Sequence, residues 1–304
     1  TMTINEKALE LHEKWNGKLD TVSKSTGKKS REDLALAYTP GVAEPCKVIA
    51  EDPEAAYRYT IKSNTVAVVS DGSAVLGLGN IGPLAAMPVM EGKAVLFKEF
   101  GGINAFPICL DTQNTEEIIE TVVRIAPAFG GINLEDISAP RCFEIEERLK
   151  KLLNIPVFHD DQHGTAIVVL AGIINALKVT GKKKEDCRVV VNGAGSAGVA
   201  ITKLLLNYGF PHITMCDKTG MLCKGMEGLN WMQEKMVEVT NLEHKTGTLA
   251  DALKSADIFV GVSAPGIVSQ EMVASMNKIP FSLQWQTRFR RSCRIWQKLL
   301  VQES

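Results

Sequence analysis

The sequence lacks the features of a secreted or membrane-embedded protein. It contains no Cys-x-x-Cys pair, and its seven cysteines are scattered and odd in number, which is typical of free, mostly buried thiols in a reducing cytoplasm. The first ten residues carry Glu6 and Glu10 and no apolar core, so we expect no signal peptide. The longest apolar stretch, 165–179, is too short to span a bilayer and is interrupted by Gly172 and Asn175. We therefore expect a cytoplasmic protein in which this stretch is a buried helix.

A surplus of charge is also missing. The 34 lysines and arginines nearly balance the 35 acidic residues, for a formal net charge of -1, so the chain has no general attraction for nucleic acid or an anionic membrane. A content of 45% hydrophobic and 23% charged residues is typical of a folded globular protein, and 304 residues suffice for two domains. We expect a small-molecule partner bound at a defined site, and neither nucleic acid nor a membrane.

Short β-branched runs alternate with helical patterns along most of the chain. Strands are predicted at 65–69, 155–158, 188–192 and 212–216, and helices at 5–16, 114–125, 197–207 and from about residue 163 to 180. This alternation predicts an α/β fold with parallel sheets. We place a domain boundary near residue 160, which gives an N-terminal α/β domain, 1–160, and a second α/β domain, 161–304.

The pattern Gly-x-Gly-x-x-Gly occurs twice, at 77–82 and at 193–198, and the spacing alone is a weak signal. The second copy follows a predicted strand and opens a helix, and Asp217 lies at the end of the next strand, 19 residues beyond Gly198. This context completes the fingerprint of a Rossmann-type dinucleotide-binding domain. The first copy has no such acid and is followed by Pro83, so we interpret it as a structural or substrate-side loop.

Each position of the second copy has a physical task. Gly193 permits the tight turn, Gly195 lets a pyrophosphate approach the backbone, and Gly198 lets helix and strand pack closely. Ser196 and Ala197 begin the helix, whose free N–H groups and positive dipole end would face the phosphates. A glycine turn that only packs is the alternative.

Two further features bear on the cofactor. Asp217 would accept hydrogen bonds from the adenosine ribose and favours NAD, because the 2′-phosphate of NADP would meet a carboxylate. Lys218 weakens that preference, so NADP remains the alternative. Farther on, the predicted strand 255–260 leads into the small-residue loop 261–266, which contains Ser263. Such a loop lies along a bound cofactor or is an ordinary turn, and the sequence leaves both open.

Acidic pairs follow two apolar segments. Glu135 and Asp136 come after one, and Asp160 and Asp161 come after the strand predicted at 155–158. In open α/β folds the ends of strands are where sites are built. Carboxylates gathered there would repel one another unless a cation lay among them, and oxygen ligands select Mg²⁺ or Mn²⁺. The alternative is a pair of solvated surface features.

Several segments resemble, in order and spacing, blocks of the short bacterial malic enzymes. They are 38–43, 70–82, 91–97, 133–137 and 158–165, and with the glycine turn they extend over residues 30–270. The resemblance implies oxidative decarboxylation of malate to pyruvate and CO₂ with reduction of NAD(P), by an N-terminal substrate and metal domain and a Rossmann-type NAD(P)-binding domain. It also implies a homodimer.

The resemblance assigns roles to individual side chains. The metal ligands would be Glu135, Asp136 and Asp161, the general base Lys93, the general acid Tyr38, and the partner of Lys93 would be Asp160. Neutral Lys93 would accept the 2-hydroxyl proton of malate, hydride would pass from C2 to the nicotinamide, and Tyr38 would protonate C3 after CO₂ leaves. Without the matched blocks, a solvated amine and a phenol at the edge of the core would be expected at these two positions. A two-domain amino-acid dehydrogenase, which needs no carboxylate metal site, is the nearest other enzyme class.

The tail, 279–304, departs from that pattern. It contains two of the chain's four tryptophans, where the family pattern has a strand and an Ala-Asn-Pro turn whose asparagine contacts substrate. Regrouping the possible codons of 284–288 from the third base gives Met or Val, a forced Ala, Asn or Asp, and then permits Pro. We therefore interpret the tail as a frameshift product. If it is instead a genuine divergent tail, the chain would be a nucleotide-binding but catalytically impaired family member.

Overall fold

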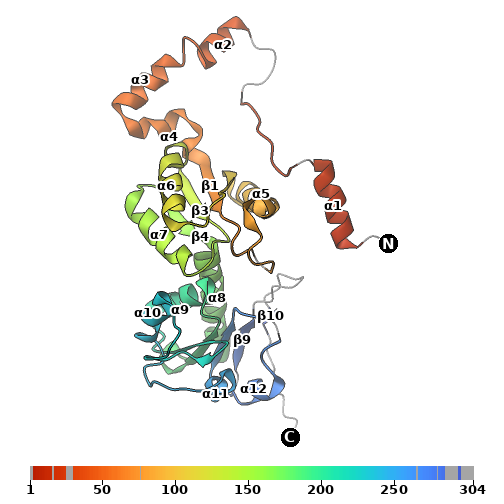
Figure 1. Ribbon diagram of the computed structural model, residues 1–304, viewed down its shortest axis with the longest axis vertical. Coiled ribbons are helices and arrows are strands. Elements are labelled where there is room, and N and C mark those ends of the chain that lie inside the picture. Colours follow the sequence, from red (N-terminus) through yellow and green to blue (C-terminus); the bar gives the residue numbers. More distant parts are fainter. Residues whose placement is uncertain are drawn as a thin grey trace. The chain divides into compact units, whose positions relative to one another are not determined.

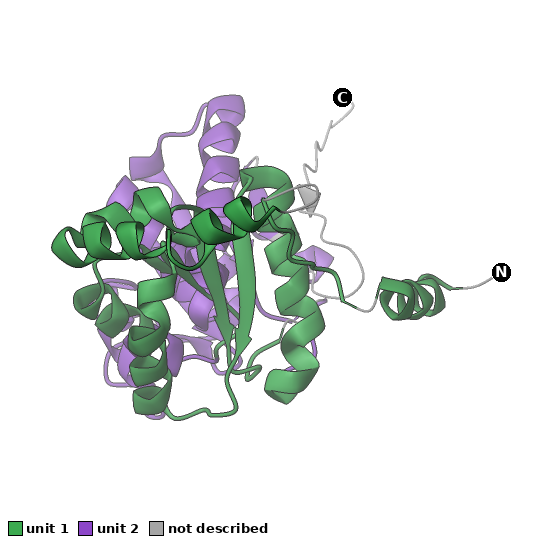
Figure 2. Cartoon of the chain, turned by 90° about the horizontal axis from the view of Figure 1, so that it is seen from above, with its two compact units in different colours: residues 1–75, 80–137, 145–158 green, residues 76–79, 138–144, 159–304 purple. Residues whose placement is uncertain are grey.

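The computed structural model describes residues 3–15, 17–24, 30–75, 77–264, 266–278, 280–284 and 294–295. The chain divides into two compact units, coloured green and purple in Figure 2. Unit 1 comprises Thr1–Val75, Asn80–Ile137 and Ile145–Phe158, and unit 2 comprises Leu76–Gly79, Ser138–Glu144 and His159–Ser304. Each unit contains a sheet with parallel strands and covering helices, which confirms the predicted α/β class.

The sheet of unit 1 has four strands in the order β2-β1-β3-β4. They are β1 (Thr65–Ser70), β2 (Asn104–Cys109), β3 (Gly131–Leu134) and β4 (Val157–His159). Strand β1 pairs in parallel with β2 and with β3. All its residues except Val66 are buried, as expected of a strand covered on both faces, and the strand predicted at 65–69 is confirmed.

Helices cover both faces of this sheet. The helices found up to residue 152 are α1 (Ile4–Trp15), α2 (Arg31–Ala37), α3 (Ala43–Glu51), η1 (Pro53–Ala55), α4 (Ala56–Tyr59), η2 (Ile61–Asn64), α5 (Gly82–Gly101), α6 (Thr115–Ile125), η3 (Ala126–Ala128) and α7 (Arg141–Leu152). Helix α5 packs Ala86, Met90 and Ala94 against β1 and β2, and Figure 1 shows α6 on the opposite face. By contrast, α1, α2 and α3 bury none of their residues.

The sheet of unit 2 has the order β10-β9-β8-β5-β6-β7. Its strands are β5 (Arg188–Asn192), β6 (His212–Asp217), β7 (Gly220–Met221), β8 (Ile258–Gly261), β9 (Phe281–Gln284) and β10 (Arg294–Ile295). The central pairs β5–β6, β5–β8 and β8–β9 are parallel, and β7 and β10 pair antiparallel at the edges. The predicted βαβ unit is therefore confirmed.

The helices of unit 2 form two layers around this sheet. They are α8 (Asp160–Thr180), η4 (Lys184–Asp186), α9 (Ser196–Tyr208), α10 (Trp231–Val237), α11 (Leu249–Leu253) and α12 (Gln270–Ala274). Side chains of α8 and α9 pack on one face, with Val189 and Val191 of β5. Side chains of α11 and α12 pack on the other, with Val190 of β5. Successive side chains of β5 point to opposite faces of the sheet, so the strand contributes to two separate hydrophobic cores.

Helix α8 differs from the prediction in two respects. It begins at Asp160 rather than near residue 163, and it is not buried all round. Ala166, Val169 and Ile173 lie on the buried face at helical spacing, whereas Ile167 is 63% exposed. With 21 residues and a mean hydropathy of 1.5, α8 is long and apolar enough to cross a membrane by length and composition alone, a test that core helices of soluble proteins also pass.

Two other predictions concern the cysteines and the tail. The six cysteines of the described chain are free thiols, as expected, although only three of them are buried: Cys142, Cys187 and Cys216. Of the tail, residues 281–284 form β9 beside β8 and residues 294–295 form β10. The remainder, which contains most of the proposed frameshift, lies outside the described residues.

Candidate functional site

Two buried carboxylates follow β3 directly. Glu135 and Asp136 are 4% and 3% exposed. The backbone fixes both, because the Glu135 N–H donates to the Val69 carbonyl over 2.9 Å and the Ala74 N–H donates to the Asp136 carbonyl over 2.9 Å. Asp136 has a φ of 53°, a left-handed conformation that costs free energy in a non-glycine residue and is concentrated at functional sites. The acids are therefore not solvated surface features.

Lys93 of α5 reaches the first of these acids. Its side chain is only 14% exposed, and its Nζ lies 3.1 Å from Oε1 of Glu135. The amide of Asn133 donates to the other oxygen, Oε2, over 2.9 Å. A lysine held this way is not the solvated amine that its sequence context alone would suggest. These two contacts give the buried carboxylate of Glu135 polar partners, which lowers the cost of burying it.

Asp160 and Asp161 directly follow strand β4, as predicted, and they also form the first turn of α8. Free N–H groups and the helix dipole stabilise negative charge there. His159, which is fully buried at the N-terminus of the helix, places its Nδ1 3.7 Å from Oδ2 of Asp161. A Cβ at Gly164 would come within 2.4 Å of Oδ1 of Asp160, so the glycine leaves room for that carboxylate. Strand β4, which these residues follow, neighbours β3 in the sheet of unit 1.

Tyr38 is in a different setting from Lys93. It follows α2, and its side chain is 73% exposed. Without the family resemblance we expected a phenol at the edge of the core at this position. Within a single chain that expectation is wrong, because the side chain is mostly exposed.

Sequence reasoning missed another buried acid at the same end of the unit 1 sheet. Asp71 follows β1 and is fully buried. Its Oδ1 accepts hydrogen bonds from the Ser73 N–H over 3.0 Å and from the Ser73 hydroxyl over 2.6 Å. The strand-end argument that singled out Glu135 applies equally to this position, because the run 65–69 was recognised as a strand. Applying it to each strand would have identified Asp71.

The loop that holds the first glycine motif closes on itself. The carbonyl of Gly72 accepts from the N–H groups of Ile81 and Gly82 over 3.1 and 3.2 Å. A Cβ at Gly72 would lie 2.2 Å from the Gly82 carbonyl oxygen. Contrary to our argument from Pro83, a helix does follow this copy. Proline fits in the first turn of α5 because no helical partner exists there for an N–H group.

The second glycine motif has the geometry of a dinucleotide-binding turn. Gly193 has a φ of 120°, and a Cβ on it would lie 2.9 Å from the Val262 carbonyl oxygen. A Cβ on Gly198 would lie 1.6 Å from the Gly193 carbonyl oxygen. A Cβ on Gly195 would meet nothing within 4 Å. Two glycines thus serve close packing, and the third leaves open space at the N-terminus of α9, where Ser196 and Ala197 form the first turn.

Side chains at the ends of β5, β6 and β8 surround this turn. The buried Asn192 donates from Nδ2 to Oγ of Ser263 over 2.8 Å, and the Val262 N–H donates to the Asn192 carbonyl over 2.9 Å. Asp217 ends β6, and its Oδ1 accepts from the Thr219 N–H and hydroxyl over 2.7 and 2.5 Å. The loop with Ser263 therefore adjoins the glycine turn, through an asparagine that sequence reasoning did not single out.

Comparisons with known proteins agree with this geometry. The family model of the malic enzyme N-terminal domain matches residues 16–150, and that of the malic enzyme NAD-binding domain matches residues 162–280. The chain is 57% identical over 280 residues to the bifunctional malic/malolactic enzyme of Bacillus subtilis (strain 168), a match that covers 92% of this chain and 68% of that protein.

Two further relatives extend the comparison. The chain is 60% identical over 279 residues to the NAD-dependent malic enzyme of Geobacillus stearothermophilus, covering 92% of this chain and 58% of that protein. The crystal structure of the NAD-dependent malic enzyme from Thermotoga maritima matches with a TM-score of 0.88 and 52% identity, covering 90% of this chain and 73% of that one. The resemblance inferred from sequence motifs is thereby confirmed, and the chain belongs to the malic enzyme family.

Proposed function

We propose that the protein oxidatively decarboxylates malate to pyruvate and CO₂ while reducing NAD(P). The observation that carries this proposal is the buried group at the end of β3, where Nζ of Lys93 lies 3.1 Å from Oε1 of Glu135 and the buried Asp136 is the next residue. This group lies in a chain that matches both domains of the malic enzyme family in order. A buried amine next to carboxylates provides a proton acceptor and oxygen ligands in one place.

We assign the cofactor as NAD, with NADP as the alternative. The open side of Gly195 and the first turn of α9, with Ser196 and Ala197, would hold the pyrophosphate. Asp217 would accept from the ribose hydroxyls through its carboxylate. The Geobacillus relative, which is named as NAD-dependent, supports this choice. Ser263, tied to the turn by Asn192, would line the cofactor from the side of β8.

The metal in this proposal is Mg²⁺ or Mn²⁺, held by Glu135, Asp136 and Asp161. The donor set fits, because all three groups are hard carboxylate oxygen ligands and two of them are buried. The three acids also follow β3 and β4, which are neighbours in one sheet. When bound, such an ion would stabilise negative charge on the oxygen at C2 of the substrate.

The remaining roles follow the direction of proton movement. Lys93 would accept the proton of the 2-hydroxyl, with Asp160 as its second acidic neighbour. Tyr38 would donate a proton to C3 once CO₂ has left. Two observations support these roles: Lys93 contacts the proposed metal ligand Glu135, and Asp160 precedes the proposed ligand Asp161 in the sequence. In this assignment residues 1–160 bind the substrate and, together with Asp161, the metal, and residues 161–304 bind the cofactor.

A homodimer is part of the same proposal. The exposed Tyr38 lies between α2 and α3, and none of the described residues of α1, α2 and α3 is buried. Helices α1 and α2 expose the large apolar side chains of Leu9, Leu34 and Leu36. A second copy that covered this surface would remove it from water. We place the dimer in the cytoplasm, with no nucleic acid or membrane partner.

A coupled assay tests the proposal. Malate should yield pyruvate and reduced nicotinamide in equal amounts, and both should depend on added Mn²⁺ and disappear with a chelator. Lys93→Ala should lower turnover by on the order of 10²–10⁴-fold, as expected for loss of a general base, while cofactor binding measured by fluorescence persists. The control is Lys98→Ala, which removes an exposed lysine from the same helix. Near-normal turnover of Lys93→Ala would remove this lysine from the mechanism.

A further inference from the structure

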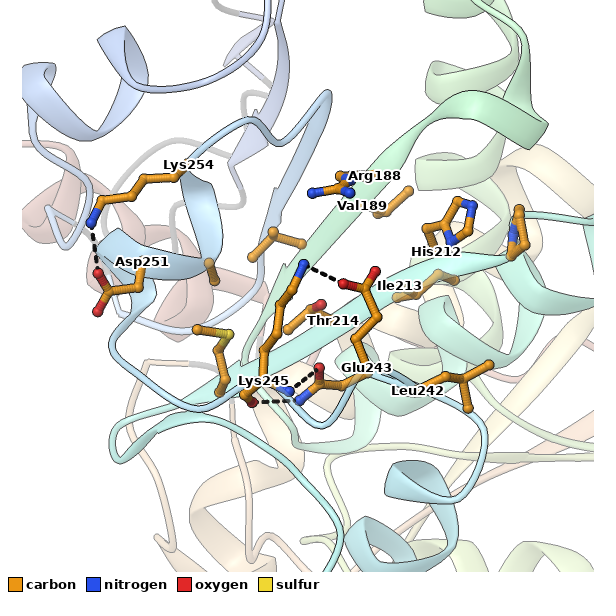
Figure 3. Close-up of a pocket in the computed structure, with 15 residues that line it drawn as sticks. Arg188, Val189, His212, Ile213, Thr214, Leu242, Glu243, Lys245, Asp251 and Lys254 are labelled. Carbon is orange, nitrogen blue, oxygen red and sulfur yellow. Dashed lines mark hydrogen bonds and ion pairs between the residues drawn. The ribbon is translucent and has the colours of Figure 1, made fainter.

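A pocket of about 320 Å³ lies within unit 2 at the amino ends of β5 and β6 (Figure 3). Arg188 and His212, the first residues of the two strands, are on its rim, and the loop 241–245 and α11 complete it. The glycine turn and Asp217 lie at the other ends of the same strands, roughly 13 Å away for a five-residue strand. The pocket is therefore separate from the proposed cofactor site, and no step of the proposed reaction uses it.

Positive charge predominates around this pocket. Two lysines already have acidic partners, since Lys245 lies 2.6 Å from Glu243 and Lys254 lies 2.9 Å from Asp251. With Arg188, the lining has three basic side chains, Arg188, Lys245 and Lys254, against the two acidic ones, Glu243 and Asp251. Its Cα neighbour across the strands is His212, so both side chains leave the sheet on the same face. Arg188 and a protonated His212 would repel each other, so an anion bound between them would be favourable.

The surroundings of Glu243 indicate where the positive charge is concentrated. Its pKa is lowered by the hydrogen bond from Lys245 and by the charges of Lys245, Arg188 and His212. Three basic side chains therefore act on one carboxylate. In Figure 3, Lys245 extends towards Glu243 between Arg188 and the loop. An anionic ligand would interact with the same basic side chains and would therefore compete with Glu243 for them.

The loop that carries this pair is rigidly built. Asn241 is buried with a φ of 46°. Its Nδ2 donates to the carbonyls of Leu222 and Lys245 over 3.0 and 2.8 Å, and its Oδ1 accepts from the Lys245 N–H over 3.1 Å. The backbone of Arg188 is held in the same way, because its N–H donates to Asp257 over 2.9 Å. The basic groups are thus presented from fixed backbone, which lowers the cost of binding.

Apolar side chains form the rest of the wall. Pro211, Leu242 and Met221 line the pocket together with Ala252 of α11. The volume lies at the lower end of the range for ligand pockets, which suits a small organic molecule and not a dinucleotide. We propose that this pocket binds a small organic anion, with its anionic group among Arg188, His212 and Lys245 and its apolar body against Pro211 and Leu242.

Calorimetric titration of the whole chain tests this site. The probes are inorganic phosphate for the anionic group alone, and phenyl phosphate and benzoate for two anionic groups on the same apolar body. Phenyl phosphate or benzoate should bind more tightly than inorganic phosphate. Arg188→Gln should weaken binding about tenfold or more, because a charge-assisted hydrogen bond is lost. Lys224→Gln is the matched control, since it removes a lysine from a comparable pair with Glu238, 2.8 Å apart, outside the pocket.

A second variant guards against misfolding as an explanation. Glu243→Gln removes the carboxylate that competes with the ligand, and it should tighten binding several-fold, which a damaged fold cannot do. Equal affinity of Arg188→Gln and the unaltered chain would overturn the proposal. So would equal losses in Arg188→Gln and Lys224→Gln, or weaker binding in Glu243→Gln.

Discussion

The proposed site of unit 1 is built from side-chain charge, whereas that of unit 2 is built from backbone. At the end of β3, two carboxylates and Lys93 are enclosed within the protein. At the end of β5, the glycine turn offers open space and the N-terminus of α9. A site of buried charges depends on the presence of each partner, because removal of one leaves another buried without compensation. A backbone site depends instead on the absence of a Cβ at a few positions. Substitutions in unit 1 should therefore act by removing a charged group, and substitutions in unit 2 should act by adding a side chain where the backbone needs space.

The largest expected effect is that of Glu135→Gln. The change removes a proposed metal ligand and the partner of Lys93 while conserving volume. We expect turnover to fall roughly 1,000-fold, equivalent to about 4 kcal/mol of barrier, and the melting temperature to fall as well, because Lys93 loses its buried partner. Steady-state kinetics over a Mn²⁺ series measures the loss.

Glu146→Gln provides the comparison for that variant. Glu146 is also buried, but it pairs with Lys150 of the same helix at 2.8 Å. This substitution should reduce stability and leave turnover largely intact. If the two variants lost activity equally, burial of a carboxylate and not its place at the end of β3 would explain the effect.

The second prediction concerns the glycine turn. In Gly198→Ala the new methyl group would lie 1.6 Å from the Gly193 carbonyl oxygen, so strand and helix must separate. We expect a loss of about 3 kcal/mol in the free energy of unfolding together with loss of cofactor binding, measured by denaturant unfolding and by fluorescence titration. Gly181→Ala is the control, because the space around that helix-ending glycine is open. It should cost less and leave cofactor binding unchanged.

The same contrast explains what sequence alone could predict. The glycine turn was predictable from the sequence, because the spacing of its three glycines between a strand and a helix is itself the signal, although the contact of Gly193 with Val262 was not. The strand β5, the helix α9 and Asp217 were predictable for the same reason. The pair Lys93 and Glu135 was not, because 42 positions separate them along the sequence and only family resemblance linked them. Its 3.1 Å contact depends on how α5 packs over β1.

The errors have a physical explanation as well. The start of α8 was placed too late because Asp160 and Asp161 are weak helix formers in a helix interior, yet they are favourable in a first turn. The apolar stretch 165–179 suggested a buried helix, but only the face with residues 166, 169 and 173 is buried, and Ile167 and Val168 are exposed. Asn192 escaped notice because its partner, Ser263, lies 71 positions away in the sequence.

A buried carboxylate in unit 2 supplies the third prediction. Burial alone would raise the pKa of Asp257, but hydrogen bonds from the Arg188 N–H, from Lys182 at 2.6 Å and from Asn277 at 3.0 Å hold it below its ordinary value of 3.8. A depressed pKa stabilises the folded state above about pH 4. That contribution is lost as the pH falls through the lower, folded-state value.

Asp257→Asn should remove this dependence. We expect a cost of about 2 kcal/mol at pH 7 that shrinks below pH 4, with catalysis by the remaining folded protein unchanged. Unfolding curves between pH 3 and 7 measure both. A constant cost across this range would show that the carboxylate's charge is not what stabilises the fold, and a loss of turnover would contradict the division between structural and catalytic acids.

The smallest expected effect is a change in cofactor preference. Asp217→Ser removes the carboxylate that a 2′-phosphate would meet and keeps a hydroxyl near Thr219. The ratio of kcat/KM for NAD to that for NADP should fall about tenfold, equivalent to about 1.4 kcal/mol, with the melting temperature nearly unchanged. Asp186→Ser, in a surface turn before β5, should leave the ratio as it was. An unaltered ratio in Asp217→Ser would mean that this carboxylate does not select the cofactor, and the backbone of the turn or the neighbouring Lys218 would then have to account for the preference.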